Sequence, residues 1–545
     1  MKRKLILALS LLIFVTTLFP IAACGGRGED DRYQVDPNRE QLYIAISDEG
    51  IGRDWLESDL IPRFEQAYPG YQVIPRVQNS ELTDGTVQLL APSSDIDIFY
   101  SQIEDLTTLE GVALDITDIV TEKVYDAQGE YVSEGGTQSI SDKLEGFNSS
   151  HYGLFNMGTA GSEKFLALPY YTTPYGIWYD VDLFENEEYY SLGYEGITGT
   201  EDDDWGPDGE EGGFDDGLPA TFEDFKLLIT TLYSDGLTPL TWSGTHSWMR
   251  THYLDTVWLN YEGVNDYDLN YTFSGTDSQF GTVSIADGWN LAGQEGRLAM
   301  LEMAHFLVSN TKFYSGDAFR STQSHLVAQQ DFLGSVTRSS RIAMIMDGSW
   351  WEYEAKGYMT SMASEKNEKY GYGKRRFGFM PVPAFIGTEG IEDQTNQETV
   401  LYDQNAMRNV FVNANTDVPE IAKAFLQFAH TNTSLSAFNR ITGTMKPYVY
   451  TMSKSDYENL TYMGKQVYDM VHEDGVRLYY NVLSKSYSKY ATYLSNWKYG
   501  TRIGDREYGG DPMFYFKENP SVTAEDYFNG MAVYYSQQTW EERVN

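Results

Sequence analysis

The stretch Leu168–Phe184, LPYYTTPYGIWYDVDLF, decides the fold that this sequence predicts. Pro169 and Pro174 each hold the preceding residue extended, which disfavours a helix in the first half. The second half, Gly176–Tyr179, is aromatic and β-branched, as is typical of a buried strand. We therefore expect a segment that crosses between two lobes and forms an aromatic wall at their junction. A strand of one core, approached by surface tyrosines, is the alternative.

Strand patterns alternate with helix patterns in the chain that precedes this stretch. Residues 42–46, 71–77 and 96–100 are predicted strands, and an amphipathic helix pattern follows the first of them. This alternation predicts an α/β fold with a parallel sheet. Open sheets of this kind bind ligands beyond the carboxyl ends of their strands. The loops Ser47–Arg53 and Ser101–Asp105 occupy those positions.

The composition limits the kinds of partner that the chain can bind. Its 545 residues suffice for about two to four domains. The formal net charge is −41, and such a surface repels nucleic acid, whose binding depends on Lys and Arg. The sequence therefore predicts no nucleic-acid partner. An aromatic content of 15% suits a core and equally a surface that binds sugars.

The N-terminus has the pattern of a lipoprotein signal. In residues 1–23, three basic residues follow Met1 and precede an apolar run too short to span a bilayer, as in a signal peptide. Cys24, the single cysteine, directly follows small residues in a sequence that resembles the lipobox of bacterial lipoproteins. We expect Cys24 to carry a lipid and residues 24–40 to form a lipidated linker. The mature protein would then be anchored at the extracellular face of the cell membrane through the lipid only.

Eight motifs in a fixed order give the chain a family resemblance. After the lipobox they are PGYQV (69–73), DIDIFYSQ (95–102), the crossing stretch (168–184), LPATFEDFKLLITTLYSDGLTPL (218–240), RIAMIMDGSWW (341–351), FGFMPVP (377–383), VNANTDVPEIAKAFLQFAHT (412–431) and ITGTMKP (441–447). With these motifs the chain resembles the family 1 extracellular solute-binding proteins, which are the lipid-anchored, sugar-capturing subunits of bacterial ABC importers.

The resemblance implies a two-lobed periplasmic-binding-protein-like fold of type II with the ligand cleft between the lobes. The N-terminal lobe would hold residues 40–168 plus 406–446, and the C-terminal lobe residues 175–405 plus 447–545. It also implies a carbohydrate ligand, delivery to ABC importer permease subunits, and no catalysis. We expect a monomer.

Three segments look like insertions relative to the family, at 120–160, 185–217 and 260–290. The second of them is dense in carboxylates and lacks Lys and Arg, and its residues 204–215 partly fit a twelve-residue calcium loop. The fit is incomplete, because Gly206 stands where an acid is expected. One structural calcium ion and a solvated acidic insertion remain alternatives, and no other cofactor is expected. The candidate metal ligands are Asp204, Asp208, Glu210 and Asp215.

A sugar site needs aromatic rings for the apolar face of a pyranose and polar side chains for its hydroxyls. Trp350 and Trp351 are adjacent in a turn after a predicted strand, so we expect one to pack inward and the other to face the cleft. Any single tryptophan of this set is more often part of a core than a ligand contact. The candidate ligand-binding residues are Gln102, Asp105, Tyr170, Tyr171, Trp242, Trp248, Arg250, Trp350, Trp351 and Trp497.

The sequence has no motif that points to catalysis. It contains no HExxH, no Walker loop and no Rossmann glycine fingerprint, and its seven histidines show no zinc-ligand spacing. A glycosidase needs only two carboxylates at the right separation, which reading the sequence does not exclude. A surface-anchored carbohydrate-active hydrolase or adhesin is therefore the alternative function.

Overall fold

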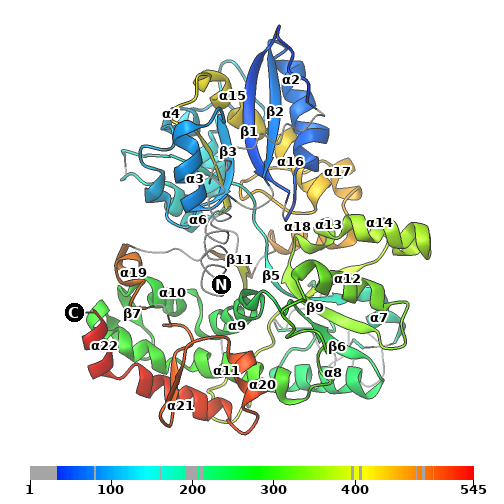
Figure 1. Cartoon of the computed structure of the whole chain (residues 1–545), viewed down its shortest axis with the longest axis vertical. Helices are drawn as coiled ribbons and strands as arrows, with labels where there is room; N and C mark the ends of the chain where they lie inside the picture. Colours follow the sequence, from blue (N-terminus) through cyan, green and yellow to red (C-terminus); the bar gives the residue numbers. More distant parts are fainter. Residues whose placement is uncertain are drawn as a thin grey trace, which may run out of the picture.

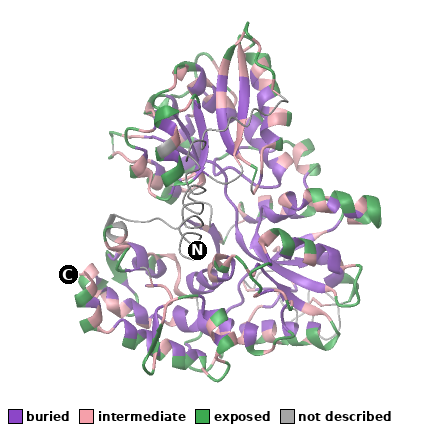
Figure 2. Cartoon of the chain, in the orientation of Figure 1, coloured by how far each residue is buried: buried purple, intermediate pink, exposed green. Residues whose placement is uncertain are grey.

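The chain forms two lobes, each built on its own β-sheet (Figure 1). The strands of the lower sheet and the inner strands of the upper sheet are largely buried, β2 (Tyr71–Gln78) is only partly buried, and exposed residues gather on the outer helices (Figure 2). This arrangement confirms the predicted α/β class with two lobes. The computed structural model describes residues 33–48, 50–78, 82–159, 161–187, 189–190, 205–207, 213–394, 398–403, 408–473, 475–480, 485–494 and 496–544.

The upper lobe in Figure 1 contains a five-stranded sheet of order β2-β1-β3-β12-β4. Its strands are β1 (Glu40–Ser47), β2 (Tyr71–Gln78), β3 (Ile98–Gln102), β4 (Leu168–Pro169) and β12 (Arg408–Val412). Strand β1 is parallel to β2 and β3, whereas β12 is antiparallel to β3 and β4. Arg408, the first residue of β12, therefore pairs with Gln102, the last residue of β3. The carboxyl ends of β1 and β3 thus share one edge with the start of β12.

Short helices pack around this sheet. In α15 the residues Ile421, Phe425 and Leu426 are buried on one face, as its amphipathic pattern predicts. Asn148 ends α5 and begins α6, where its side chain accepts a hydrogen bond from the His151 backbone N–H at 2.9 Å. The helices are η1 (Leu56–Leu60), α2 (Ile61–Ala67), α3 (Asp84–Leu90), η2 (Ala91–Ser93), η3 (Leu106–Leu109), α4 (Thr117–Thr121), α5 (Ile140–Phe147), α6 (Ser149–Phe155), α15 (Pro419–Ala429), α16 (Asn432–Thr442) and α17 (Lys454–Glu458).

The lower lobe contains a four-stranded sheet of order β10-β5-β9-β6. Its strands are β5 (Tyr175–Asp180), β6 (Thr238–Thr241), β9 (Ile342–Gly348) and β10 (Phe377–Met380). Every residue of β5, β9 and β10 is buried, in keeping with their apolar and aromatic sequences. Helices around this sheet are α7 (Val181–Asn186), α8 (Phe222–Ser234), α12 (His325–Ser335), α13 (Trp351–Glu354), α14 (Lys356–Glu365), η5 (Glu368–Tyr370) and α18 (Tyr462–Met470).

A helical part completes the lower lobe on the left of Figure 1. Helix α9 packs against α11, and α11 against α20 and α21. No helix in the described part of the chain is long and apolar enough to cross a membrane. The elements are α9 (Ser247–Glu262), α10 (Val264–Thr272), β7 (Gly275–Asp277), β8 (Gly281–Val283), η4 (Ile285–Gly293), α11 (Glu295–Ser309), α19 (Lys485–Tyr490), β14 (Thr501–Ile503), β15 (Arg506–Tyr508), α20 (Pro512–Glu518), α21 (Ala524–Tyr534) and α22 (Gln537–Val544).

The crossing stretch begins in one sheet and ends in the other, because β4 belongs to the upper sheet and β5 to the lower. Beside it lies a two-stranded parallel ribbon of β11 (Thr399–Asp403) and β13 (Val476–Tyr480), which the sequence analysis did not predict. Asn260 of α9 attaches this ribbon to the lower lobe, since its side chain bonds both the N–H and the C=O of Val400 at 2.9 and 2.8 Å. The ribbon is therefore bonded to the lower lobe through α9.

A buried ion cluster joins β5 to its neighbours in the lower lobe. The Asp180 carboxylate binds Arg341 and Arg375, and it also accepts a hydrogen bond from the Leu183 backbone N–H at 3.1 Å. Burial alone would raise the pKa of Asp180, but the two guanidinium groups outweigh it and hold the pKa below its ordinary value. The cluster thus stabilises the fold only while the carboxylate is ionised.

We expect Asp180→Asn to lower the free energy of unfolding by about 3–5 kcal/mol, because it leaves buried guanidinium charge uncompensated. Asp182→Asn is the matched control, since Asp182 pairs with Arg376 at the surface and should contribute about 1 kcal/mol or less. Because the pKa of Asp180 is lowered in the folded protein, wild type exceeds Asp180→Asn in free energy of unfolding by the whole amount near neutral pH. This difference disappears as the pH falls below about 4 and the carboxylate is protonated. Urea denaturation near neutral pH and below pH about 4 measures the free energy of unfolding of each variant. Equal losses of stability in Asp180→Asn and Asp182→Asn at neutral pH would contradict the assignment.

Candidate functional site

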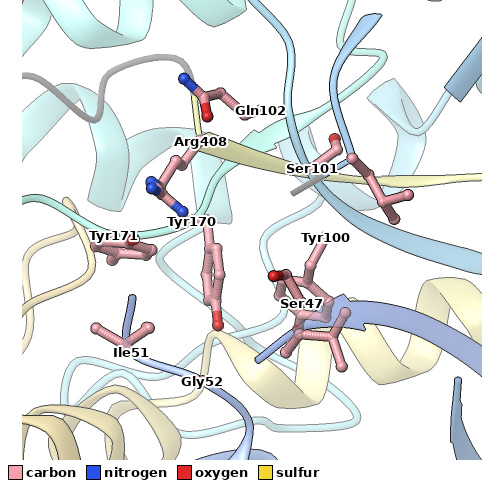
Figure 3. A pocket seen from close by; sticks show the side chains of 11 residues that line it. Ser47, Ile51, Gly52, Tyr100, Ser101, Gln102, Tyr170, Tyr171 and Arg408 are labelled. Atoms are coloured by element: carbon pink, nitrogen blue, oxygen red, sulfur yellow. The ribbon is translucent and has the colours of Figure 1, made fainter. Parts of the chain in front are cut away.

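A small pocket lies at the edge of the upper sheet where β1 and β3 end. Its cavity volume is about 20 Å³, room for about one water molecule. Figure 3 shows Arg408 lying between Gln102 and the rings of Tyr170 and Tyr171. The pocket is where the strand-end rule for open α/β sheets places a ligand. The full lining is Ile46, Ser47, Ile51, Gly52, Leu82, Tyr100, Ser101, Gln102, Tyr170, Tyr171 and Arg408.

Cation–aromatic contact orders one side of this pocket. The Arg408 guanidinium carbon is 5.2 Å from the centre of the Tyr171 ring. The loop after β1 approaches the same ring, and a Cβ at Gly50 would lie 3.2 Å from the Tyr171 hydroxyl. Gly50 also has a φ of +66°, a conformation that other residues rarely adopt. Gly50 therefore lets the loop lie against the tyrosine.

A buried lysine supports the other side of the pocket from behind. Lys446 is 1% exposed, and its Nζ lies 5.3, 5.6 and 5.2 Å from the ring centres of Trp55, Tyr170 and Phe438. Its amine has no hydrogen-bond partner in the described part of the chain, and burial lowers the pKa of Lys446 to about 7. Trp55 Nε1 donates to the Tyr170 hydroxyl at 3.0 Å. These contacts fix the orientation of the Tyr170 ring.

The lower lobe presents a polar cluster at the carboxyl end of β9. Gln329 Nε2 donates to Asp347 Oδ2 at 3.0 Å and to Glu354 Oε2 at 2.7 Å. Burial, together with the neighbouring Glu354 carboxylate, raises the pKa of Asp347 to about 8. His325 Nε2 lies 3.4 Å from Glu354 Oε1. Near neutral pH Asp347 is therefore mostly protonated, and the cluster has less negative charge than its two carboxyl groups suggest.

The two lobes meet at this cluster. The Gly50 backbone N–H of the upper lobe donates to Glu354 Oε1 of the lower lobe at 3.2 Å. Gly50 also adjoins Tyr171 and Arg408, so the pocket of Figure 3 lies beside the lobe contact. The site is therefore composed of a tyrosine- and arginine-lined pocket on one lobe and an acid–amide cluster on the other.

Trp350 lies at the same end of β9, next to this cluster. Its ring covers the backbone of Gly348, where a Cβ would lie 1.7 Å from the ring, so only glycine fits there. The Trp350 ring is 6.3 Å from the Tyr175 ring. The Tyr175 hydroxyl and Ser349 Oγ are buried and have no hydrogen-bond partner within the described residues. Ligand hydroxyls could provide those missing bonds.

The structure brings together only some of the predicted ligand-binding residues. Gln102, Tyr170 and Tyr171 line the pocket. Trp350 lies beside the lobe contact and is 6% exposed. Trp248, near the start of α9, is half-buried between two histidines. Its ring centre lies 5.8 Å from that of His246 and 5.6 Å from that of His252.

Five further predicted residues have structural partners in the described part of the chain, and their contact with a ligand stays a prediction. Arg250 is buried, with Nε 2.6 Å from Asp511 Oδ2, and Asp105 accepts a hydrogen bond from the Thr107 N–H that caps η3. The other three are fully buried tryptophans in cores, where packing fixes their rings. Trp242 packs against Tyr314 and Phe319, Trp351 against Phe332 and Phe377, and Trp497 against Tyr535 and Trp540.

The acidic insertion is described only in part. Asp204, Asp208 and Glu210 lie outside the described residues. Asp215 is buried, and its carboxylate lies so close to Gly206 that a Cβ there would be 2.4 Å from Asp215 Oδ2. The described residues contain no group of three or more potential metal ligands. The calcium ion therefore stays a prediction.

Several site residues were missed by the sequence analysis. Gly52 and Ser47 belong to the predicted strand-end loop, so the strand-end rule alone could have identified them. Arg408 and Glu354 carry no comparable local signal, because antiparallel pairing and the lobe contact bring them to the site.

We expect Glu354→Ala to favour a more open arrangement of the lobes in the unliganded protein. The variant removes a hydrogen bond to a charged acceptor, worth about 1.5–3 kcal/mol, so closed lobes should become about ten- to a hundredfold less populated relative to open ones. Small-angle scattering should give a larger radius of gyration than wild type. Glu365→Ala, at an exposed position on α14, is the control. Identical scattering from both variants would show that the lobes do not depend on this contact.

Comparisons with known proteins agree with this architecture. A search of curated protein sequences finds no match. Solved structures of similar fold include RafE in complex with raffinose (13% identity, 92% of this chain and 99% of that chain, TM-score 0.52) and a chitin oligosaccharide binding protein (14% identity, 92% and 99%, TM-score 0.53). Maltose-bound MalE3 from T. maritima is another (12% identity, 91% and 98%, TM-score 0.52). A family model described as bacterial extracellular solute-binding protein matches residues 51–434. This chain belongs to the bacterial extracellular solute-binding protein family.

Proposed function

We propose that this chain captures a carbohydrate between its lobes and delivers it to the permease of an ABC importer. The observation that carries the proposal is the pairing of the pocket in Figure 3 with Trp350 and the polar cluster across the lobe contact. An aromatic ring such as that of Trp350 buries the apolar face of a sugar. Arg408 and Gln102 supply donors and acceptors for its hydroxyls.

Charge also favours a neutral ligand. The chain has a formal net charge of −41, which repels anions at long range. The lower side of the site attracts cations only weakly as well, because the raised pKa of Asp347 reduces the negative charge of this cluster near neutral pH. Proteins of the same fold have been solved with raffinose and with maltose, which supports a sugar in this cleft.

The expected experiment is calorimetric titration of the mature protein with neutral di- to hexasaccharides, combined with chromatography of the sugars after incubation. Wild type should bind at least one sugar and leave it intact. We expect Trp350→Ala to weaken binding about ten- to a hundredfold, because a buried ring of this size contributes about 1.5–3 kcal/mol.

Tyr493→Ala is the control, since the Tyr493 ring is 58% exposed. Unchanged affinity in a folded Trp350→Ala protein would remove this ring from the site. Cleavage of the sugar would favour the alternative hydrolase, and no binding of any sugar would overturn the proposal.

Membrane attachment through a lipid on Cys24 belongs to the same proposal. A lipid would hold the captured sugar close to the permease. We expect Cys24→Ala to move the protein from the membrane fraction into the medium, because residues 24–40 would then have no anchor. Immunoblotting of the two fractions measures this, and Cys24→Ser is a second variant that keeps the size of the side chain. Retention of both variants in the membrane fraction would contradict lipid anchoring.

A further inference from the structure

A second groove lies where the insertions 120–160 and 260–290 approach each other. Its volume is about 510 Å³, within the range of about 300–1,000 Å³ typical of small-molecule sites. One wall is Asn148–Ser150, at the junction of α5 and α6 in the upper lobe. The other wall is formed by α10 and β7, and Arg477–Tyr480 of β13 lines the groove as well. We call this space the insertion groove.

The insertion groove lies between the lobes and is separate from the pocket of Figure 3. Asn148 Nδ2 of the upper lobe donates to the Leu478 carbonyl at 3.3 Å. The buried His151 ring stacks on Tyr480 with centres 3.9 Å apart and an interplanar angle of 26°. Because Asn148–Ser150 belong to the upper lobe and α10 and β7 to the lower lobe, a molecule in the groove contacts both lobes. Such a ligand favours closure, since it binds the closed arrangement better than the open one.

The chemistry of the groove suits a neutral polyhydroxylated ligand. Its walls supply mainly hydroxyl and amide groups, from Ser149, Ser150, Asn265, Thr272, Ser274 and Thr276. Asp268 accepts a hydrogen bond from the Tyr479 hydroxyl at 3.0 Å, and Arg477 lies 3.8 Å from Glu398. One carboxylate and one guanidinium leave the lining without a strong net charge. Tyr479 and Tyr480 also line the groove, with 4% and 2% of their surface exposed.

A row of rings connects the main site with the insertion groove. Trp248 contacts His252 at 5.6 Å between ring centres. His252 stacks on Tyr402 at 5.6 Å, and Tyr402 stacks on Tyr479 at 6.0 Å, with interplanar angles of 28° and 29°. At the other end, His246 joins Trp248 to His325, which lies against Glu354 at the lobe contact. Side chains that contact one another therefore run without a break from the lobe contact to the groove.

We propose that the insertion groove is a distal carbohydrate subsite, so that the chain selects oligosaccharides longer than a disaccharide. This inference rests on the proposed function, because it assigns further units of the same ligand to the groove. The two insertions then have a function of their own: they lengthen the cleft on both lobes and close on the far end of the ligand.

The test compares short and long members of one sugar series. Maltose and maltohexaose, and chitobiose and chitohexaose, are titrated calorimetrically into wild type and variants. Ser150→Trp fills the groove from the upper wall, and Arg477→Gln removes its only guanidinium among the lining residues. Glu145→Trp on α5 and Arg502→Gln on β14 are matched controls at exposed positions outside the groove.

We expect wild type to bind the hexasaccharide of its preferred series more tightly than the disaccharide. Each groove variant should weaken hexasaccharide binding by about tenfold or more, because a hydrogen bond to a charged group is lost or the space is filled. Disaccharide binding should stay within about twofold of wild type, and the controls should change neither.

Equal affinity for short and long sugars, or wild-type hexasaccharide binding by both folded groove variants, would overturn the distal subsite and leave the proposed function standing. If wild type binds none of the four sugars or any other neutral oligosaccharide, the proposed function and the subsite are both wrong. Trp350→Ala separates the two sites, since it should weaken short and long sugars alike.

Discussion

Among the described residues, three segments that run between the lobes meet at the buried Thr172. Its backbone N–H donates to the Met445 carbonyl at 2.8 Å, and its hydroxyl donates to the Asp403 carboxylate. The Tyr480 hydroxyl lies 3.2 Å from the same Oγ1. The crossing stretch, the end of β11 and the return from α16 are thus bonded to one another at a single point. Rotation of the lobes must be absorbed by the few residues on either side of it.

This junction explains why the site and the insertion groove belong to one moving system. The pocket of Figure 3 includes Tyr170 and Tyr171, which directly precede Thr172. The insertion groove includes Tyr480, which contacts Thr172 itself. A ligand that touches either place therefore acts on the same hinge. A ligand long enough to touch the pocket and the insertion groove makes contacts in both places that exist only when the lobes are closed. Such contacts shift the equilibrium from open to closed lobes.

The sequence was sufficient to predict the two lobes and the sheet edge at which the pocket of Figure 3 lies, because both follow from local patterns. Prolines and a β-branched aromatic run define the crossing stretch, and strand ends identify the loops Ser47–Arg53 and Ser101–Asp105. The role of a tryptophan is different, since its burial depends on residues far along the chain. Trp497, for example, is buried because Trp540 and Tyr535 pack against it, at 4.8 and 4.7 Å between ring centres. No pattern around position 497 contains that information.

The acidic composition of the chain and the chemistry of its site are separate properties. Most carboxylates raise solubility and exclude anionic ligands at long range. At the lobe contact, individual side chains instead determine the local charge. Burial and Glu354 raise the pKa of Asp347, and Arg408 faces Tyr171 across the pocket. A cleft without strong charge inside an acidic protein retains little attraction for ions of either sign. Its affinity must then come from ring packing and hydrogen bonds, which are the interactions that distinguish one neutral sugar from another.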